Sequence, residues 1–334
     1  MDGGGKLAPV ETAAVPPNVL RRTRHVADRV GDMALYGLTG LAALSAMLII
    51  AAIIYKVADG AWPAIHHFGI GFIWDGTWNP VIGREAYGAR NFILGTLVTS
   101  FCAMLIAAPL SIAIGLFLSE LAPNAIRGPI GSLVEMLAAV PSVVVGLWGI
   151  LVLGPYMRVH VEPFLGHHFG WIPIFSGDAQ QSGVLVTIVV LTIMTIPITS
   201  SICRELFSGV PKELKEAAVG LGATRWEMVR DVVVYDVRGG VVAGVILGLG
   251  RALGEAIAVT QVIGNSLGPF HLSLFDTGNT LASQIAASYQ GAATNLQVSA
   301  LVYLALILLV ITFTANLIAQ RIVHRFELQR TGAS

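Results

Sequence analysis

The sequence predicts an all-α integral membrane protein with six transmembrane helices, and two observations support this prediction. The 334 residues are 55% hydrophobic and only 12% charged, with a mean hydropathy of +0.75, whereas a soluble domain carries about 25% charged residues. The apolar residues also come in blocks of roughly 20, the length that crosses a bilayer as a helix. We place the spans at about 34–55, 92–118, 130–153, 183–203, 239–264 and 298–320.

Lysine and arginine are unequally divided between the segments that connect the spans, and cytoplasmic segments carry the excess. The N-terminal segment, the loops after the second and fourth spans and the C-terminal segment hold 15 of the 20 basic residues. An even number of spans agrees with this alternation. We therefore expect a multi-pass protein of the plasma (inner) membrane, embedded in the lipid bilayer, with both termini in the cytoplasm.

The spans divide the chain into four expected parts. They are a cytoplasmic tail over 1–33, a first transmembrane helix with its outer loop over 34–90, a transmembrane core over 91–320 and a second cytoplasmic tail over 321–334. The first apolar block is too long for a signal-peptide core, so we interpret it as a retained helix.

Composition and residue spacing give no reason to expect a nucleic-acid partner, a bound metal, another cofactor or an enzymatic site. The net charge is zero, so nothing suggests a nucleic-acid partner. No His, Cys and Asp grouping has the spacing of a metal site, and no other cofactor is expected. No arrangement of nucleophile and base occurs in the spans, which makes a membrane enzyme the least favoured reading.

The densest charged segment, residues 204–238, interleaves charged side chains with apolar ones at roughly helical spacing. Pro211 can open a helix at its first turn, and the stretch VGLGAT can end it. This pattern predicts two short amphipathic helices beside the membrane, facing the cytosol. The alternative is a solvated loop between two spans.

Residues 216–222 read Glu-Ala-Ala-Val-Gly-Leu-Gly, and this stretch resembles the EAA motif of ABC-importer permeases. The residues that match the motif in spacing are Glu216, Ala217, Ala218 and Gly222, while Tyr235 stands where the motif has proline. The resemblance implies that this loop carries a coupling helix, which fits a cleft on a cytoplasmic ATPase.

Further motifs follow one another in the order and topology of one group of these permeases. They are GTLVTS (95–100), LFLSELAP (116–123), EMLAAVPSVVVGLWG (135–149) and GLGRALGEAIAVTQVIGN (248–265). Together they are similar to permeases of the phosphate-specific ABC importer, of the PstC type, over about residues 90–320. The resemblance implies the MetI-like fold of type I importers.

The same resemblance implies a set of partners. They are a second, PstA-like permease subunit, a PstB-like ATPase dimer and an extracytoplasmic, PstS-like phosphate-binding protein. The chain lacks the G-x-x-x-x-G-K-[ST] phosphate loop of an ATPase. ATP hydrolysis is therefore expected on a partner chain, and no catalytic residue is expected in this one.

Arg251 lies about twelve positions into the fifth span, near the middle of a ~30 Å core at 1.5 Å per residue. An arginine at that depth is costly unless it faces a cavity or a partner, so we take it as a candidate for the substrate pathway. Its planar donors suit phosphate. Glu255, expected on the same helical face, could orient Arg251 and accept a hydrogen bond from a phosphate O–H, which sulfate lacks. A purely structural ion pair is the alternative.

Three further residues are weaker pathway candidates. Thr260 extends a polar face towards the outer end of the fifth span. Glu135 could pair with a basic residue such as Arg127 or line the inner mouth, and Ser142 follows Pro141 at an expected helix irregularity.

Two other functions stay open from the sequence. One is a permease of the same fold for sulfate, molybdate or phosphonate. The other is an ion-coupled secondary transporter, which would have related halves or repeated broken helices. Neither feature is visible in the sequence.

Overall fold

The computed structural model describes the backbone of residues 26–331 and the side chains of residues 31–324. Most of the predicted N-terminal tail and the end of the C-terminal tail lie outside the described residues. The first half of the described chain contains α1 (Val26–Phe68), α2 (Gly71–Trp74), β1 (Trp78–Asn79), β2 (Ala86–Tyr87), α3 (Arg90–Leu116), η1 (Phe117–Leu121), α4 (Asn124–Ala138), α5 (Ser142–Trp148), η2 (Gly149–Leu153), α6 (Gly154–Tyr156), η3 (Met157–Val161), α7 (Glu162–Phe169) and η4 (Pro173–Phe175). The second half contains α8 (Val184–Ser208), α9 (Lys212–Gly220), α10 (Arg225–Glu227), η5 (Met228–Val234), α11 (Tyr235–Gly254), α12 (Ile257–Val262), α13 (Leu281–Ser288) and α14 (Asn295–Thr331).

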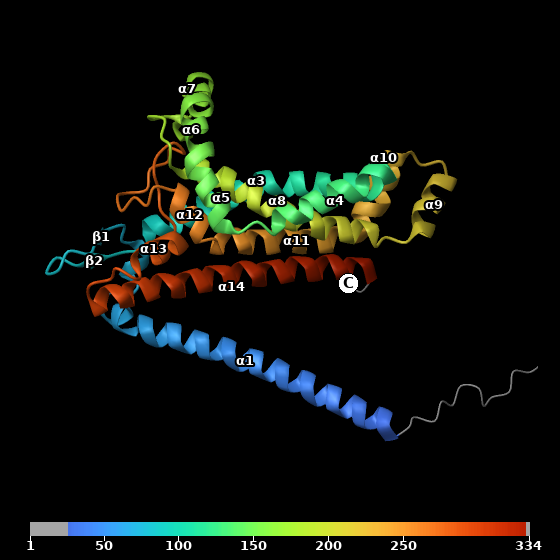
Figure 1. Cartoon of the computed structure of the whole chain (residues 1–334), viewed down its shortest axis with the longest axis horizontal. Helices are drawn as coiled ribbons and strands as arrows, with labels where there is room; N and C mark the ends of the chain where they lie inside the picture. Colours follow the sequence, from blue (N-terminus) through green and yellow to red (C-terminus); the bar gives the residue numbers. More distant parts are fainter. Residues whose placement is uncertain (1–25, 332–334) are drawn as a thin grey trace, which may run out of the picture. The chain divides into compact units, whose positions relative to one another are not determined.

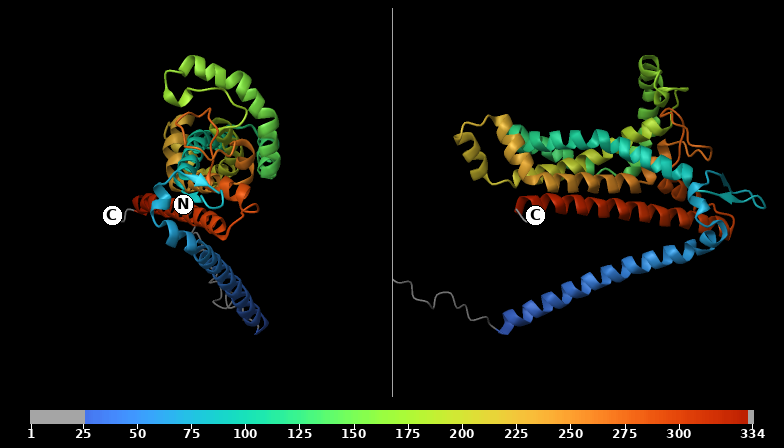
Figure 2. Two further views of the ribbon diagram at one scale, coloured as in Figure 1. Left: turned by 90° about the vertical axis from the view of Figure 1, so that its left-hand side faces the viewer. Right: turned by 180° about the vertical axis from the view of Figure 1, so that it is seen from behind.

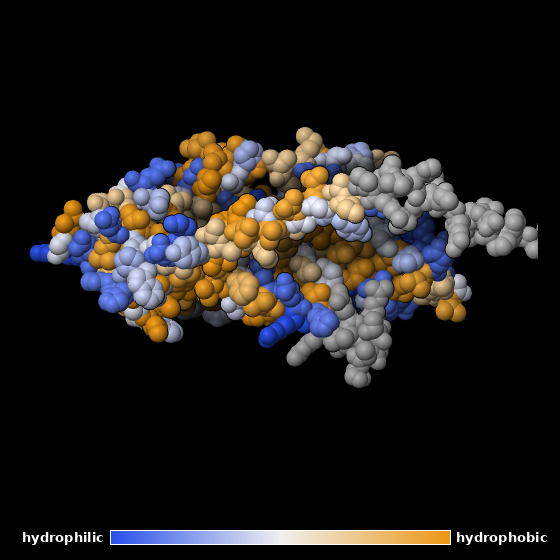
Figure 3. Space-filling model, turned by 90° about the horizontal axis from the view of Figure 1, so that it is seen from below, coloured by the Kyte–Doolittle hydropathy of each residue, from blue (hydrophilic) through white to orange (hydrophobic). Residues whose placement is uncertain are grey.

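Six helical stretches of the described chain are long and apolar enough to cross a membrane, as predicted. They are Gly31–Phe68, Arg90–Leu121, Ser142–Phe169, Val184–Ser208, Arg225–Gly254 and Asn295–His324. Large apolar side chains are exposed over their surfaces, and Figure 3 shows such hydrophobic residues over much of one face. This exposure is the pattern of a protein whose solvent is lipid.

The third and fifth predicted spans are wrong in their boundaries. The third, expected over 130–153, is interrupted at residues 139–141, where Pro141 cannot donate a helical hydrogen bond. The fifth, expected to 264, ends at Gly254, and Glu255 is extended with a φ of −70° and a ψ of 113°. The break at 139–141 lies where an irregularity was expected beside Pro141, whereas the break after Gly254 was not predicted.

The chain divides into two packed units, residues 1–56 and residues 57–334. The described part of the first unit is one apolar helical stretch with exposed side chains. In the second unit, α3, α8, α11 and α14 run side by side (Figures 1 and 2). Glycines permit the closest approaches: a Cβ on Gly248 would lie 2.5 Å from Thr199 Oγ1, and one on Gly244 would lie 2.9 Å from Ile202 Cγ2.

The stretch from α5 to α7 runs across the direction of these helices in all three views (Figures 1 and 2). Residues 154–169, which the predicted spans placed in an outer loop, are mostly helical. The crossing places α5 against α12, where Gly146 has no side chain and a Cβ would approach Ala258 Cα to 2.8 Å.

Main-chain hydrogen bonds join loops at the end of the unit where α8 begins. Gly183 N–H donates to the Val262 carbonyl at 2.9 Å, and the next two amides, of Val184 and Leu185, donate to the carbonyls of Asp276 and Leu274 at 3.0 and 2.8 Å. The start of α8 is thus fixed to the last residue of α12 and to the segment that follows it.

An aromatic cluster anchors the β1–β2 hairpin at the same end. Trp78 lies 4.7 Å from Tyr87 and 5.2 Å from Phe92 between ring centroids, and Phe72 stacks on Tyr303 at 4.5 Å. Burial raises the pKa of the Tyr87 phenol. The hairpin is therefore held by a packed apolar base.

Candidate functional site

The predicted cytoplasmic loop contains one separate helix, α9, followed by the first turns of the helix that continues into the fifth span. α9 begins directly after Pro211, which fixes an extended backbone before the first turn. It carries Glu216, Ala217 and Ala218, and none of its residues is buried. The second predicted helix is not separate, because α10 and η5 run directly into α11.

A tight turn separates α9 from α10. Gly222 adopts a φ of +91°, Gly222 N–H donates to the Val219 carbonyl at 3.0 Å, and Ala223 N–H donates to the Ala218 carbonyl at 3.1 Å. This pair of bonds is the glycine-terminated helix end known as the Schellman motif. The EAA-like glycine is therefore required by backbone conformation.

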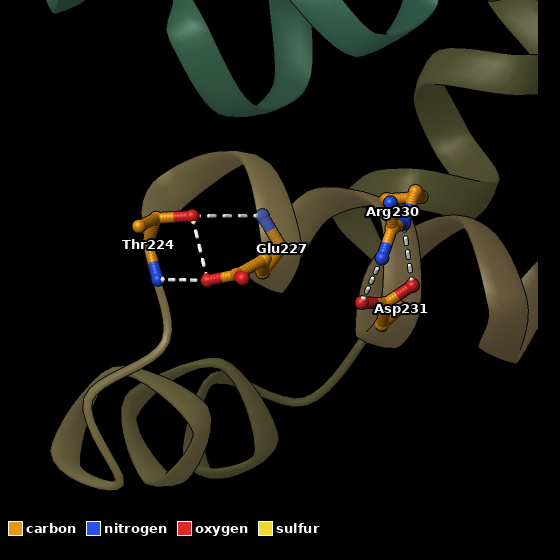
Figure 4. Close-up of polar contacts among 4 residues, drawn as sticks. All are labelled: Thr224, Glu227, Arg230 and Asp231. Carbon is orange, nitrogen blue, oxygen red and sulfur yellow. Dashed lines mark hydrogen bonds and ion pairs between the residues drawn. The ribbon is translucent and has the colours of Figure 1, made fainter.

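A capping box starts the next helix (Figure 4). Glu227 N–H donates to Thr224 Oγ1 at 3.3 Å, and Thr224 N–H donates to Glu227 Oε2 at 2.8 Å. Arg230 and Asp231 form an exposed ion pair on the following turn, with a shortest N–O distance of 2.7 Å. Turn and cap together fix the direction in which the chain returns to the bundle.

Replacing Gly222 with alanine is expected to strain this turn by about 1–2 kcal/mol, because a Cβ disfavours a left-handed backbone. No atom lies within 4 Å of the added Cβ, so steric contact does not contribute. We expect weaker co-purification of the ATPase with the purified permease complex. Gly220→Ala is the matched control, since Gly220 also has open space but lies in the helix. Equal ATPase retention by the two variants would contradict the role of the turn.

The break after Gly254 changes the relation between Arg251 and Glu255. They do not share one helical face, because α11 ends between them. Arg251 is exposed on the last turn of α11, at the negative end of the helix dipole. Glu255 is half-buried, and its Oε1 accepts a hydrogen bond from Ala258 N–H at 3.4 Å, at the start of α12. Within residues 31–324 no ion pair joins the two side chains.

The other predicted pathway residues are distributed around the two breaks. Ser142 is half-buried at the first residue of α5, beside the irregularity expected at Pro141. Thr260 lies on α12, and its hydroxyl donates to the Ala256 carbonyl at 2.7 Å. The next residue, Gln261, belongs to the same polar face, and its Oε1 is buried without a hydrogen-bond partner among the described residues.

Glu135 lies in the last turn of α4, just before the break at 139–141, and pairs with Arg204 at 3.2 Å rather than with Arg127. Arg204 lies directly over Gly131, where a Cβ would overlap its guanidinium. Arg127 Nη2 instead donates to the Ala122 carbonyl at 3.4 Å. Because Gly131 has no side chain, the guanidinium of Arg204 can lie against α4 and reach Glu135.

The arrangement of six spans, the separate helix α9 and its glycine turn corresponds to a known class. A family model described as "binding-protein-dependent transport system inner membrane component" matches residues 111–328. The chain belongs to this family of membrane transport components.

Within the family, the chain is similar to proteins named phosphate transport system permease protein PstC. It is 44% identical to that of Pasteurella multocida, covering 85% of this chain and 89% of the relative. It is 46% identical to that of Haemophilus influenzae, covering 86% and 92%, and 41% identical to that of Mesorhizobium japonicum, covering 90% and 92%. The resemblance seen in the motifs is confirmed.

Solved structures show the same fold. A bacterial alginate ABC transporter chain, 18% identical, covers 88% of this chain and 97% of its own length with a TM-score of 0.57. A chain of the inward-facing MetNI methionine ABC transporter, 19% identical, covers 70% and 94% with a TM-score of 0.54. The predicted MetI-like, six-span fold class is confirmed.

Proposed function

We propose that this chain is the PstC-type permease subunit of an ATP-driven importer of inorganic phosphate. The observation that carries the proposal is its identity of 41% to 46% to three proteins named as phosphate transport permeases, over 85% to 90% of the chain. The relatives and the family description name transport components, not enzymes. The chain would form part of the membrane path, while a separate subunit hydrolyses ATP.

The proposed partners are a PstA-like permease, a PstB-like ATPase dimer and a PstS-like phosphate-binding protein. The family description, which names dependence on a binding protein, supports the last of them. The ABC transporter neighbours support the ATPase. The distribution of lysine and arginine supports cytoplasmic termini and a cytoplasmic α9, so that Glu216, Ala217, Ala218 and Gly222 would meet the ATPase.

Arg251 is the proposed phosphate contact. It is exposed on this chain, and the described residues offer it no carboxylate. A charge in that position within the membrane needs a polar cavity or an anion. Its guanidinium presents paired donors to phosphate oxygens. Glu255, one residue beyond the helix end, would accept a phosphate O–H, while Ser142, Thr260 and Glu135 are proposed as further pathway residues.

The breaks at 139–141 and after Gly254 are compatible with a transport path through this part of the chain. Backbone that leaves a helix within the membrane is tolerated where protein or a water-filled cavity surrounds it. The breaks at 139–141 and 255–256 therefore mark positions where α4 and α5, and α11 and α12, can change their mutual direction as the path opens first outward and then inward.

The test is uptake of labelled phosphate into proteoliposomes that contain the complete complex, in the presence of the binding protein. We expect labelled phosphate to accumulate with ATP and not with a non-hydrolysable analogue, and an excess of unlabelled sulfate to leave the rate unchanged. Accumulation of sulfate or molybdate in place of phosphate would assign the permease to another oxyanion. Uptake without ATP would indicate a secondary transporter.

A further inference from the structure

Helix α9 has few attachments to the rest of the permease. None of its residues is buried, and large apolar side chains such as Leu214 and Val219 are exposed. It packs mainly on η5, at the start of the fifth span. A helix held only by such contacts would tilt under load instead of moving the bundle.

Lys215 is the exception on this helix. Its Nζ lies 2.6 Å from Glu120 Oε1, and it also donates to the Phe207 carbonyl at 3.3 Å. The side chains of Lys215 and Glu120 are only 17% and 9% exposed. The Arg230–Asp231 pair on the neighbouring turn is 59% and 55% exposed, and such solvated pairs add little stability. The Lys215 pair is thus a largely solvent-shielded, directional link.

The link reaches two helices of the bundle. Glu120 belongs to η1, which continues α3 without a break. Phe207 lies in the last turn of α8, where the carbonyl end of the helix favours a cation. These two helices pack along each other over most of their length (Figure 1), and α8 also contacts α11, which carries Arg251.

We propose that the Lys215–Glu120 ion pair is the tether that transmits movement of α9 to α3 and α8. Both are positioning residues, which touch neither ATP nor phosphate. The proposal rests on the proposed function and specifies how movement of the ATPase is transmitted to the membrane-spanning helices. Without the tether, the ATPase can still bind α9 and hydrolyse ATP, but α9 moves without carrying α3 and α8 with it.

The test must separate a lost tether from a buried unpaired charge, since removing one partner of a buried pair is strongly destabilising by itself. We therefore compare Lys215→Met with the double variant Glu120→Gln and Lys215→Met, which leaves no charge behind. Lys212→Met is the matched control, because Lys212 lies on the same helix, is exposed and has no polar partner among the described residues. Each complex is measured in proteoliposomes for ATPase content, ATP hydrolysis and phosphate uptake.

We expect the double variant to retain the ATPase and to hydrolyse ATP, but to transport roughly five- to tenfold less phosphate per ATP, a range typical of altered coupling networks. The Lys212→Met variant should keep the wild-type ratio. A wild-type ratio in the double variant would overturn the tether, and so would loss of the ATPase from it, which would make the pair part of the docking surface. Absence of phosphate uptake by the wild-type complex would instead overturn the proposed function, and the tether with it.

Discussion

An Arg251→Ala complex is expected to take up phosphate roughly 10- to 100-fold more slowly than the wild type, while it still assembles and hydrolyses ATP. The range corresponds to the loss of one or two hydrogen bonds between charged groups. Arg251 is exposed on the last turn of α11, so its removal leaves no buried cavity and no unpaired carboxylate among the described residues. The measurement is ATP-driven uptake of labelled phosphate, normalised to permease content.

Two companion variants show which property of the arginine is needed. Arg251→Lys keeps the charge but not the planar fork, so an intermediate rate is expected if bidentate contact matters. Glu255→Gln keeps the size of the side chain, and we expect weaker discrimination of phosphate from sulfate. Wild-type uptake by Arg251→Ala would remove this residue from the path, and unchanged discrimination in Glu255→Gln would restrict that residue to capping α12.

A Gly95→Ala chain is expected to lose about 3 kcal/mol of stability or to fail to accumulate, because a side chain there has no space. A Cβ on Gly95 would overlap the backbone oxygen of Asn279 and lie 3.1 Å from its carbonyl carbon. The obstacle is main chain, and it cannot rotate away. The next residue, Thr96, accepts the Leu281 N–H at 2.9 Å, so a shift of α3 would also break the start of α13.

Thermal unfolding of the detergent-purified chain measures this effect. Gly37→Ala is the matched control, since Gly37 lies in α1 with nothing within 4 Å of an added Cβ and no proline directly after it. The control should be neutral or slightly more stable, because alanine favours a helix. A Gly95→Ala chain that melts at the same temperature as the control would show that the contact between α3 and the segment before α13 is absent from the purified chain.

The sequence predicted the features that depend on local chemistry. Apolar length located six spans, and Pro211 with Gly222 located the ends of α9. It indicated the irregularity at Pro141 but did not predict the end of α11 at Gly254, inside an apolar stretch. A window of apolar residues has the same hydropathy whether the backbone continues or bends. Gly254 was a usable signal, because glycine is common at helix ends.

The ion pairs were beyond prediction for a different reason. Lys215 and Glu120 are 95 residues apart, and Arg204 and Glu135 are 69 apart. Several cations and carboxylates in the segments expected on the cytoplasmic side were equally plausible partners in the sequence. Which residues pair depends on tertiary packing, which brings α4 against α8 and Glu120 of η1 against Lys215 of α9. At Gly131 the missing side chain leaves room for Arg204.

The three main-chain hydrogen bonds that fix Gly183, Val184 and Leu185 to the end of α12 and the segment after it limit how the bundle can deform. Sliding α8 past that segment would break all of them, at roughly 0.5–1.5 kcal/mol each. The start of α8 is therefore the fixed end of this helix, and a swing of α8 would pivot there. A swing about this pivot is largest at the opposite end of α8, where Lys215 contacts Phe207. Small rotations near the pivot thus correspond to wide excursions at α9.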